Sequence, residues 1–173
     1  MTGELQTQSP LRIVLIICIA LVLVAATLIG AKLISSGGMR FAGQKPTNIG
    51  IQSGQLAPCP NTPNCVNSQS QDAQNRIEPL TYNSTPTEAI ANLKKVIESQ
   101  ERTKIITETD NYLYAEFTSK LMGFVDDVEF LVDDSAKVIH VRSASRLGKS
   151  DLGVNRTRIE TIRAKLNELK SQV

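Results

Sequence analysis

Four arginines, two glycines and several small polar residues are concentrated in the segment 141–160, VRSASRLGKSDLGVNRTRIE. Guanidinium groups bind carboxylate or phosphate in bidentate fashion, and a glycine-containing loop that leads into a helix directs backbone N–H groups at an anion. The segment therefore predicts an anion-binding loop, although it lacks the GxxxxGK[ST] pattern of a P-loop. The predicted ligand-binding residues are Arg142, Ser145, Arg146, Gly148, Ser150, Asp151, Gly153, Asn155 and Arg156.

A catalytic role has weaker support from the same part of the chain. Ser143 is a candidate nucleophile, and Asp126 and Asp151 are candidate general bases. The chain has one histidine, His140, and strand alternation directs it away from Ser143. The sequence therefore favours a protein that is not an enzyme, and it predicts no cofactor.

Two predicted strands, 124–132 and 137–145, position most of these side chains and form a hairpin closed by residues 133–136. Five acids lie between residues 126 and 134, and eight bases against three acids lie between residues 142 and 170. One interpretation is therefore that these charges neutralise one another within the fold. The predicted cross-strand pairs are Val128–Val141, Phe130–Ile139, Asp127–Arg142, Glu129–His140 and Asp126–Ser143.

The other elements complete an α+β fold. A capping box formed by Thr85 and Glu88, with Pro86 at the first helical position, begins a helix. We expect about four antiparallel strands, with two helices packed on one face of the sheet. Besides the hairpin, the predicted elements are a helix at 85–100, strands at 104–109 and 112–119, and a helix at 154–170.

An uncharged apolar segment, 13–31, lies between Arg12 and Lys32 and has about the length needed to span a hydrocarbon core. It predicts a single-pass transmembrane helix or signal anchor at 11–34, and a cleaved signal peptide is the competing interpretation. The remaining predicted parts are an N-terminal tail at 1–10, a flexible glycine-rich tether at 35–56 and one globular domain at 57–173.

Two cysteines, Cys59 and Cys65, lie close together in a loop rich in proline and asparagine. Such a pair favours a disulfide in an oxidising compartment, whereas the basic residues that follow the apolar segment favour a cytoplasmic domain. The cysteine pair carries more weight here, so we expect the domain outside the cytoplasm. A zinc site is not expected, because two thiolates and one histidine fall short of four ligands.

The charge balance argues against a nucleic-acid partner. From Phe41 onward the chain has 16 basic and 16 acidic residues, and it contains no tryptophan. It therefore offers neither a net positive charge for phosphates nor many rings on which bases would stack.

Three motifs, CPNTPNCVNS at 59–68, FVDDVEF at 124–130 and RSASRLGKSDLGVNRTRIE at 142–160, resemble the domain of unknown function 1499 family of bacterial and plastid proteins. The resemblance extends from Ala57 to the last predicted helix, and it implies no activity. Family members often carry a signal or membrane segment, including those of cyanobacteria and photosynthetic eukaryotes. The signature positions that it implies are Cys59, Asn61, Pro63, Cys65, Asp126, Asp127, Arg142, Ser143, Ser145, Arg146, Gly148, Asp151, Gly153, Asn155 and Arg156.

These observations favour a membrane-anchored binding or accessory domain on the periplasmic or thylakoid-lumenal side. It is expected to engage a partner protein or a small anionic ligand through the loop 142–158, together with the cysteine loop. Two alternatives stay open: a hydrolase acting on an anionic envelope substrate, and a charge cluster that is purely structural.

Overall fold

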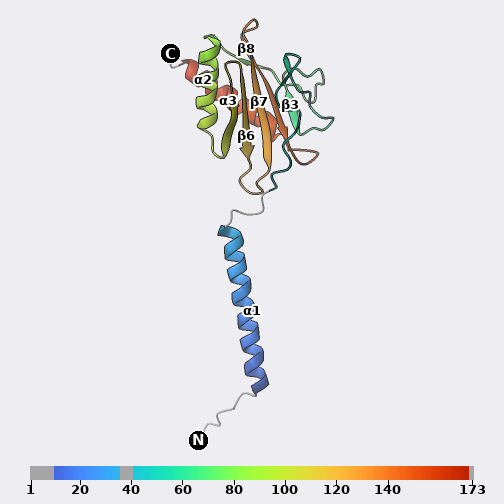
Figure 1. Cartoon of the computed structure of the whole chain (residues 1–173), viewed down its shortest axis with the longest axis vertical. Helices are drawn as coiled ribbons and strands as arrows, with labels where there is room; N and C mark the ends of the chain where they lie inside the picture. The colour runs from blue at the N-terminus through green and yellow to red at the C-terminus, as the bar shows by residue number, and fades with distance from the viewer. Residues whose placement is uncertain (1–9, 36–40, 172–173) are drawn as a thin grey trace. The chain divides into compact units, whose positions relative to one another are not determined.

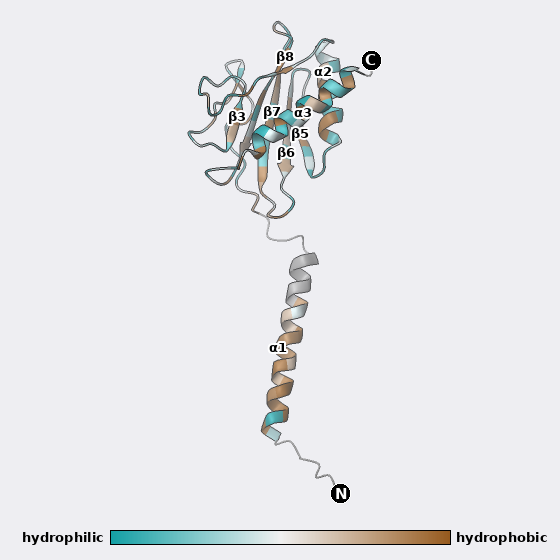
Figure 2. Ribbon diagram, turned by 180° about the vertical axis from the view of Figure 1, so that it is seen from behind, coloured by the Kyte–Doolittle hydropathy of each residue, from teal (hydrophilic) through white to brown (hydrophobic). Residues whose placement is uncertain are grey.

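The computed structural model describes residues 10–35 and 41–171, and the chain divides into two compact units at Met39. In the first unit, helix α1 extends over Pro10–Ser35. Its side chains are exposed as far as Leu28, and most of this helix is hydrophobic, as the brown ribbon in Figure 2 shows. By length and composition α1 is able to cross a membrane, a test that an N-terminal signal sequence also passes.

The second unit is built on a six-stranded antiparallel sheet with the order β3-β8-β7-β6-β5, in which β4 also pairs with β8 (Figure 1). Its strands are β3 Cys65–Asn67, β4 Leu80–Thr81, β5 Thr103–Glu108, β6 Tyr112–Thr118, β7 Val125–Asp133 and β8 Val138–Ser145. A separate two-stranded ribbon joins β1 Ile51–Gln52 to β2 Gln55–Leu56. The α+β class is confirmed, whereas the predicted strand count was too low because β3 and β4 are too short to show alternation.

Helix α2, Pro86–Glu98, begins where its capping box predicts. The Thr85 hydroxyl accepts a hydrogen bond from the Glu88 N–H at 3.3 Å, and the Glu88 carboxylate accepts one from the Thr85 N–H at 3.1 Å. The Thr85 N–H and the Thr85 hydroxyl both donate to the exposed Glu88 carboxylate and lower its pKa. The capping box therefore fixes the start of α2 locally, without help from the rest of the fold.

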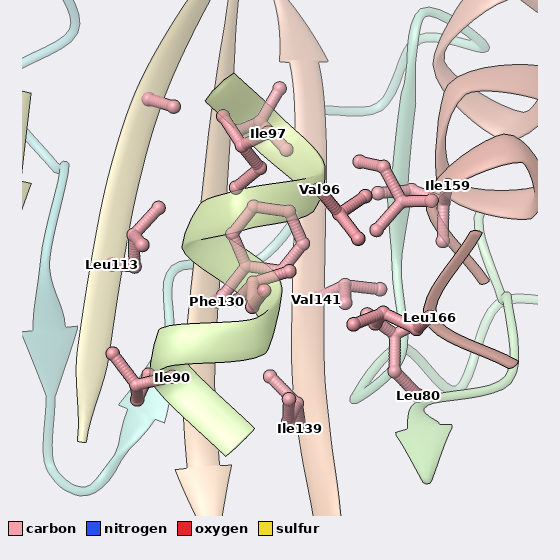
Figure 3. Close-up of a cluster of buried hydrophobic side chains, with 14 of the residues drawn as sticks. Leu80, Ile90, Val96, Ile97, Leu113, Phe130, Ile139, Val141, Ile159 and Leu166 are labelled. Atoms are coloured by element: carbon pink, nitrogen blue, oxygen red, sulfur yellow. The ribbon is translucent and has the colours of Figure 1, made fainter. Parts of the chain in front are cut away.

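Helices α2 and α3, Val154–Ser171, cover one face of the sheet, as predicted (Figure 2). Figure 3 shows Val96 and Ile97 of α2 and Ile159 of α3 meeting Phe130 and the neighbouring strand residues in the main core. All of these side chains are buried, so the helix-facing side of the sheet is closed by apolar packing.

The register of the β7–β8 hairpin differs from the prediction by two residues. Asp133 pairs with Val138, so the loop is 134–137 and not 133–136. The Asp133 carboxylate accepts hydrogen bonds from the N–H groups of Ser135 and Ala136, and Lys137 adopts φ +54°. The observed pairs are Asp126–Ser145, Asp127–Ala144, Val128–Ser143, Glu129–Arg142, Phe130–Val141, Leu131–His140 and Val132–Ile139. A shift of two keeps every side chain on its predicted face but changes its partner.

Residues 41–56, which we call the strap, belong to the second unit and pack against its sheet, where the sequence predicted part of a flexible tether at 35–56. The Phe41 N–H donates to the Met122 carbonyl at 3.1 Å, and the Gly50 N–H donates to the Glu129 carboxylate at 2.7 Å. Leu56, at the end of the strap, is buried beside Tyr112. The strap thus contacts strands β6 and β7 on the face opposite the helices; residues 36–40 lie outside the described part of the chain.

Candidate functional site

The cysteine loop is closed by the predicted disulfide between Cys59 and Cys65, whose Cα atoms lie 5.7 Å apart. Cys65 begins β3 and pairs with Ala144 of β8. The disulfide therefore connects the loop to the strand that leads into the arginine-rich segment. Asn64, immediately before Cys65, is 4% exposed and contacts that segment directly.

The disulfide is expected to stabilise the fold by restricting a short loop in the unfolded chain. Cys59→Ser should lower the free energy of unfolding by about 2 kcal/mol, the loop-closure term for a ring of this size. Urea denaturation of the full chain in detergent measures the change. Cys18→Ser, which alters the free cysteine of α1, is the matched control and should leave the midpoint unchanged. An equal effect of the two substitutions would contradict a stabilising disulfide.

Asn155, at the start of α3, is the centre of a buried hydrogen-bond network that we call the asparagine node. Its side-chain N–H₂ donates to the Asn64 carbonyl at 3.0 Å, to the Ser145 hydroxyl at 3.0 Å and to the Asp151 carboxylate at 2.8 Å. Its side-chain oxygen accepts from the Ser143 hydroxyl at 2.5 Å and from Arg158 at 2.6 Å. The node joins the cysteine loop, β8 and the helix start into one unit.

The N-terminus of α3 already has a carboxylate. Asp151 accepts hydrogen bonds from the N–H groups of Gly153 at 3.0 Å and Asn155 at 2.8 Å. Gly153 adopts φ +82° and Gly148 adopts φ +89°, conformations that favour glycine and let the loop turn sharply on both sides of Asp151. The side chain of Asp151 thus occupies the position predicted for an external anion.

Two arginines on the helix-facing side use their guanidinium groups within the fold. Arg158 donates to the Asp126 carboxylate at 2.5 Å, with both side chains about one-tenth exposed, and it lies over the Phe117 ring at 4.9 Å. Arg156 donates to the backbone carbonyls of Gln74 and Arg76 at 3.1 and 2.8 Å. The partner that the Asp126 carboxylate requires is therefore Arg158.

A second charged cluster lies on the opposite face, beneath the strap. Arg142 pairs with Glu129 at 3.0 Å, with 4% and 0% of their side chains exposed. The Glu129 carboxylate also accepts hydrogen bonds from the Tyr112 hydroxyl at 2.8 Å and from the Gly50 N–H. The prediction of Asp127 as the cross-strand neighbour of Arg142 was wrong, because the register places Glu129 there.

Asp127 instead pairs with Arg146. The Arg146 Nε donates to one Asp127 oxygen at 2.9 Å and the terminal NH₂ donates to the other at 2.7 Å, which is bidentate geometry. The same NH₂ reaches Glu116 at 2.5 Å and the Tyr114 hydroxyl at 3.2 Å. These hydrogen bonds, led by those that Arg146 donates to Asp127, raise the pKa of Arg146 and hold its charge inside the protein.

All three tyrosines keep their protons to higher pH than free tyrosine does. Burial is the main cause of the raised pKa of Tyr112 and Tyr114, and the carboxylates of Glu129 and Asp127 add to it. Burial also raises the pKa of Tyr82 to about 12, with a contribution from its hydrogen bond to Asp134.

These shifts predict a loss of stability at alkaline pH. Above the ordinary tyrosine pKa of 10.0, the unfolded chain loses protons that the folded chain retains. The stability that the three tyrosines contribute is therefore complete below pH 10. It is lost as the pH rises towards the folded pKa, by about 1.4 kcal/mol of unfolding free energy per pH unit for each tyrosine. Thermal unfolding at pH 8 to 11 should show a shallower decline for Tyr112→Phe than for the wild type. Equal slopes would contradict the raised pKa.

The three weak catalytic candidates do not form a catalytic set. The Ser143 hydroxyl is fully buried and bonds to Asn155 and Arg158, Asp126 is paired with Arg158, and Asp151 caps α3. His140 lies on the other face, with its Nδ1 3.2 Å from the Ser68 hydroxyl. No general base therefore contacts Ser143 among the residues that the structure describes.

The exposed part of the arginine-rich segment, residues 141–160, is the middle of its loop. Leu147, Gly148, Lys149 and Ser150 are exposed, and so is Leu152. The loop backbone is held from below, because the Asn64 side chain donates to the Gly148 carbonyl at 2.7 Å. The loop thus presents apolar and basic side chains from a fixed base.

Sequence reasoning missed two contributors to this arrangement. Asn64 lies in a stretch without helical or strand periodicity, although it belongs to the cysteine motif. The tyrosines opposite the helices had a detectable signal: Tyr112, Tyr114 and Glu116 alternate along β6, on the face that also carries Asp127 and Glu129. A polar face with aromatic and acidic residues required a covering element, and that element is the strap.

A comparison with protein families shows which family the chain matches. A family model described as a protein of unknown function (DUF1499) matches residues 55–166. This range contains the cysteine loop, both charged clusters and the exposed loop. No curated protein matches the chain.

Proposed function

The chain belongs to the DUF1499 family of proteins of unknown function, and we propose that it is a membrane-anchored accessory domain. It engages another component of the membrane system through the exposed residues of the loop 146–153. The single observation that carries the proposal is that the arginines in and beside this loop already have partners within the fold. They act as the support of the loop, and its exposed side chains are left for recognition.

The internal pairing alters which ligand chemistry is favoured. An external phosphate or carboxylate at Arg142 or Arg146 would have to displace Glu129 or Asp127, which are 0% and 1% exposed. Displacing a buried partner leaves an uncompensated charge, and that is costly. Lys149, which is exposed, is the group that meets an anionic partner instead.

The hydrolase alternative has no comparable support. Its candidate groups Asp126, Ser143 and Asp151 are each hydrogen-bonded within the fold, and Ser143 is fully buried. A hydrolase would need a hydroxyl or carboxylate that substrate reaches. A non-catalytic module fits the geometry better.

The cysteine pair gives the proposal a membrane side. A disulfide persists in an oxidising compartment, so the domain belongs on the periplasmic or thylakoid-lumenal side. In sealed vesicles of known orientation, protease added to that side should degrade the domain without detergent. Degradation only after the vesicles are opened would place it on the cytoplasmic side.

Recognition by the loop is tested by photo-crosslinking in native membranes. A photoreactive residue at Ser150, which is exposed on the loop, should give a crosslinked product, either a discrete adduct with a protein or an adduct with lipid. The matched control is Ser135, exposed in the β7–β8 turn, which should give none. Lys149→Glu should weaken the product, whereas Lys104→Glu, an exposed charge change on β5, should not. Equal products at Ser150 and Ser135 would contradict the proposal.

A further inference from the structure

Exposed apolar side chains gather at one end of the sheet. At this end β6 finishes, β7 begins and β8 finishes, and the loops 119–124 and 146–153 extend from it (Figure 1). Leu121 is 87% exposed and Leu152 is 96% exposed, which is unusual for leucines in a folded domain. We define the apolar tip as Phe41, Leu121, Met122, Phe124, Leu147 and Leu152.

Most of the apolar tip is one connected surface. The rings of Phe41 and Phe124 lie 5.8 Å apart, and the Phe41 N–H donates to the Met122 carbonyl. The backbone at Gly43 lies against the Leu147 side chain. The start of the strap, the 119–124 loop and the 146–153 loop therefore contribute to the same surface.

The apolar tip includes a residue that lies close in sequence to α1. Phe41 follows Ser35, the last residue of α1, by six positions. Even a fully extended link of that length spans only about 20 Å. A link of this length keeps Phe41 within reach of a membrane that contains α1.

The chemistry of the apolar tip matches a lipid interface. Interfacial segments combine phenylalanine and leucine, which enter the boundary of headgroups and acyl chains, with lysine, which meets anionic headgroups. Lys120 and Lys149 are exposed beside the apolar residues. The acid in these two loops, Asp151, is engaged as the cap of α3. Leucines that project from loops suit insertion between lipids better than a flat contact with protein.

We propose that the apolar tip inserts into the lipid interface of the membrane that α1 spans, so that the domain rests on the bilayer. The inference depends on the anchor in the proposed function and identifies the lipid surface as what the loop meets. Docking by α1 and by the tip together fixes the orientation of the domain.

The absence of tryptophan makes a direct test available, because Leu121→Trp introduces the sole indole of the full chain. The variant is reconstituted into vesicles of phosphatidylcholine and phosphatidylglycerol that contain no other protein. A fraction of the lipid carries bromine on the acyl chains, and only protein that floats with the vesicles is measured. We expect a blue-shifted emission that brominated lipid quenches at least about two-fold. The matched control, Ile51→Trp, alters an exposed residue of the strap ribbon and should not be quenched.

The outcomes separate this inference from the proposed function. Equal and weak quenching of both indoles would overturn the inference while leaving the anchor intact. Shielding of the Leu121→Trp indole in native membranes, without quenching in lipid vesicles, would assign the tip to a protein partner and also overturn it. A chain that does not float would refute the anchor and the inference together. Quenching by lipid, with no discrete protein crosslink from Ser150, would support the inference and refute a protein partner for the loop.

Two charge variants add an independent readout. Lys120→Glu together with Lys149→Glu should reduce the quenching of the Leu121→Trp indole in vesicles rich in phosphatidylglycerol. In vesicles of phosphatidylcholine alone the same pair should have little effect, because the surface there carries no net charge. An equal reduction in both vesicle types would contradict a role for the lysines at the lipid surface.

Discussion

Arg142→Met is expected to lower the melting temperature of the domain by about 10 °C or more. The substitution leaves Glu129 fully buried and without its ion-pair partner, a change that costs about 3 to 5 kcal/mol. For a domain of this size each kcal/mol corresponds to roughly 3 to 5 °C. Thermal unfolding of the full chain in detergent, followed by circular dichroism, measures the effect.

Two further variants identify the cause of that loss. Glu129→Leu combined with Arg142→Met removes both charges and should recover much of the stability, because replacing a buried pair with apolar groups is close to neutral. Lys94→Met breaks the exposed ion pair with Glu108 and should change the free energy of unfolding by less than about 1 kcal/mol. If Lys94→Met lowers the free energy of unfolding as much as Arg142→Met does, the buried Arg142–Glu129 pair contributes no more to stability than an exposed ion pair.

Asn155→Leu is expected to be the second severe substitution. Leucine has a similar volume but neither donates nor accepts, so the buried partners of the asparagine node lose their hydrogen bonds. Each buried polar group left unsatisfied costs about 1 to 3 kcal/mol, and the total should reach at least about 3 kcal/mol. Chemical denaturation gives the value, and Asn167→Leu, at an exposed position of α3, is the matched control.

The same variant should also loosen the exposed loop. Asn155 links Ser145, which immediately precedes the loop 146–153, and Asp151, near the end of that loop, to the backbone of the cysteine loop. Amide hydrogen exchange in residues 146–153 should therefore become faster in Asn155→Leu under native conditions. If the loop amides exchange only through global unfolding, and no faster than the core amides, the asparagine node does not hold the loop.

The sequence predicted the local elements well because their determinants are local. The Thr85 capping box fixes the start of α2, and apolar periodicity fixes the buried faces of α2 and α3. The β7–β8 register was wrong because its turn depends on Lys137 in a left-handed conformation, and neither glycine nor asparagine marks that position. All five predicted cross-strand pairs were therefore wrong, and Arg142, for example, faces Glu129 and not Asp127.

The rest of the site depends on contacts between distant parts of the chain. Nothing in residues 41–56 indicated that they cover Tyr112 and Glu129, because their glycines are equally typical of a flexible tether. The sequence left an anion site and internal neutralisation of the arginines both open, because charge counts do not show which acid each arginine contacts. Those partners, Asp126, Asp127 and Glu129, alternate between the two faces of β7, so one acidic strand neutralises charges on both sides of the sheet.

The Arg146–Asp127 pair gives the most direct test of whether the arginines support the loop from within the fold. A double-mutant cycle of Arg146→Met and Asp127→Asn, measured as free energies of unfolding of the full chain, isolates the coupling between the two side chains. Their bidentate contact, with both side chains less than one-tenth exposed, predicts a coupling of at least about 2 kcal/mol. A coupling near zero would show that Arg146 does not depend on Asp127, and it would return the guanidinium to the role of a free anion-binding group.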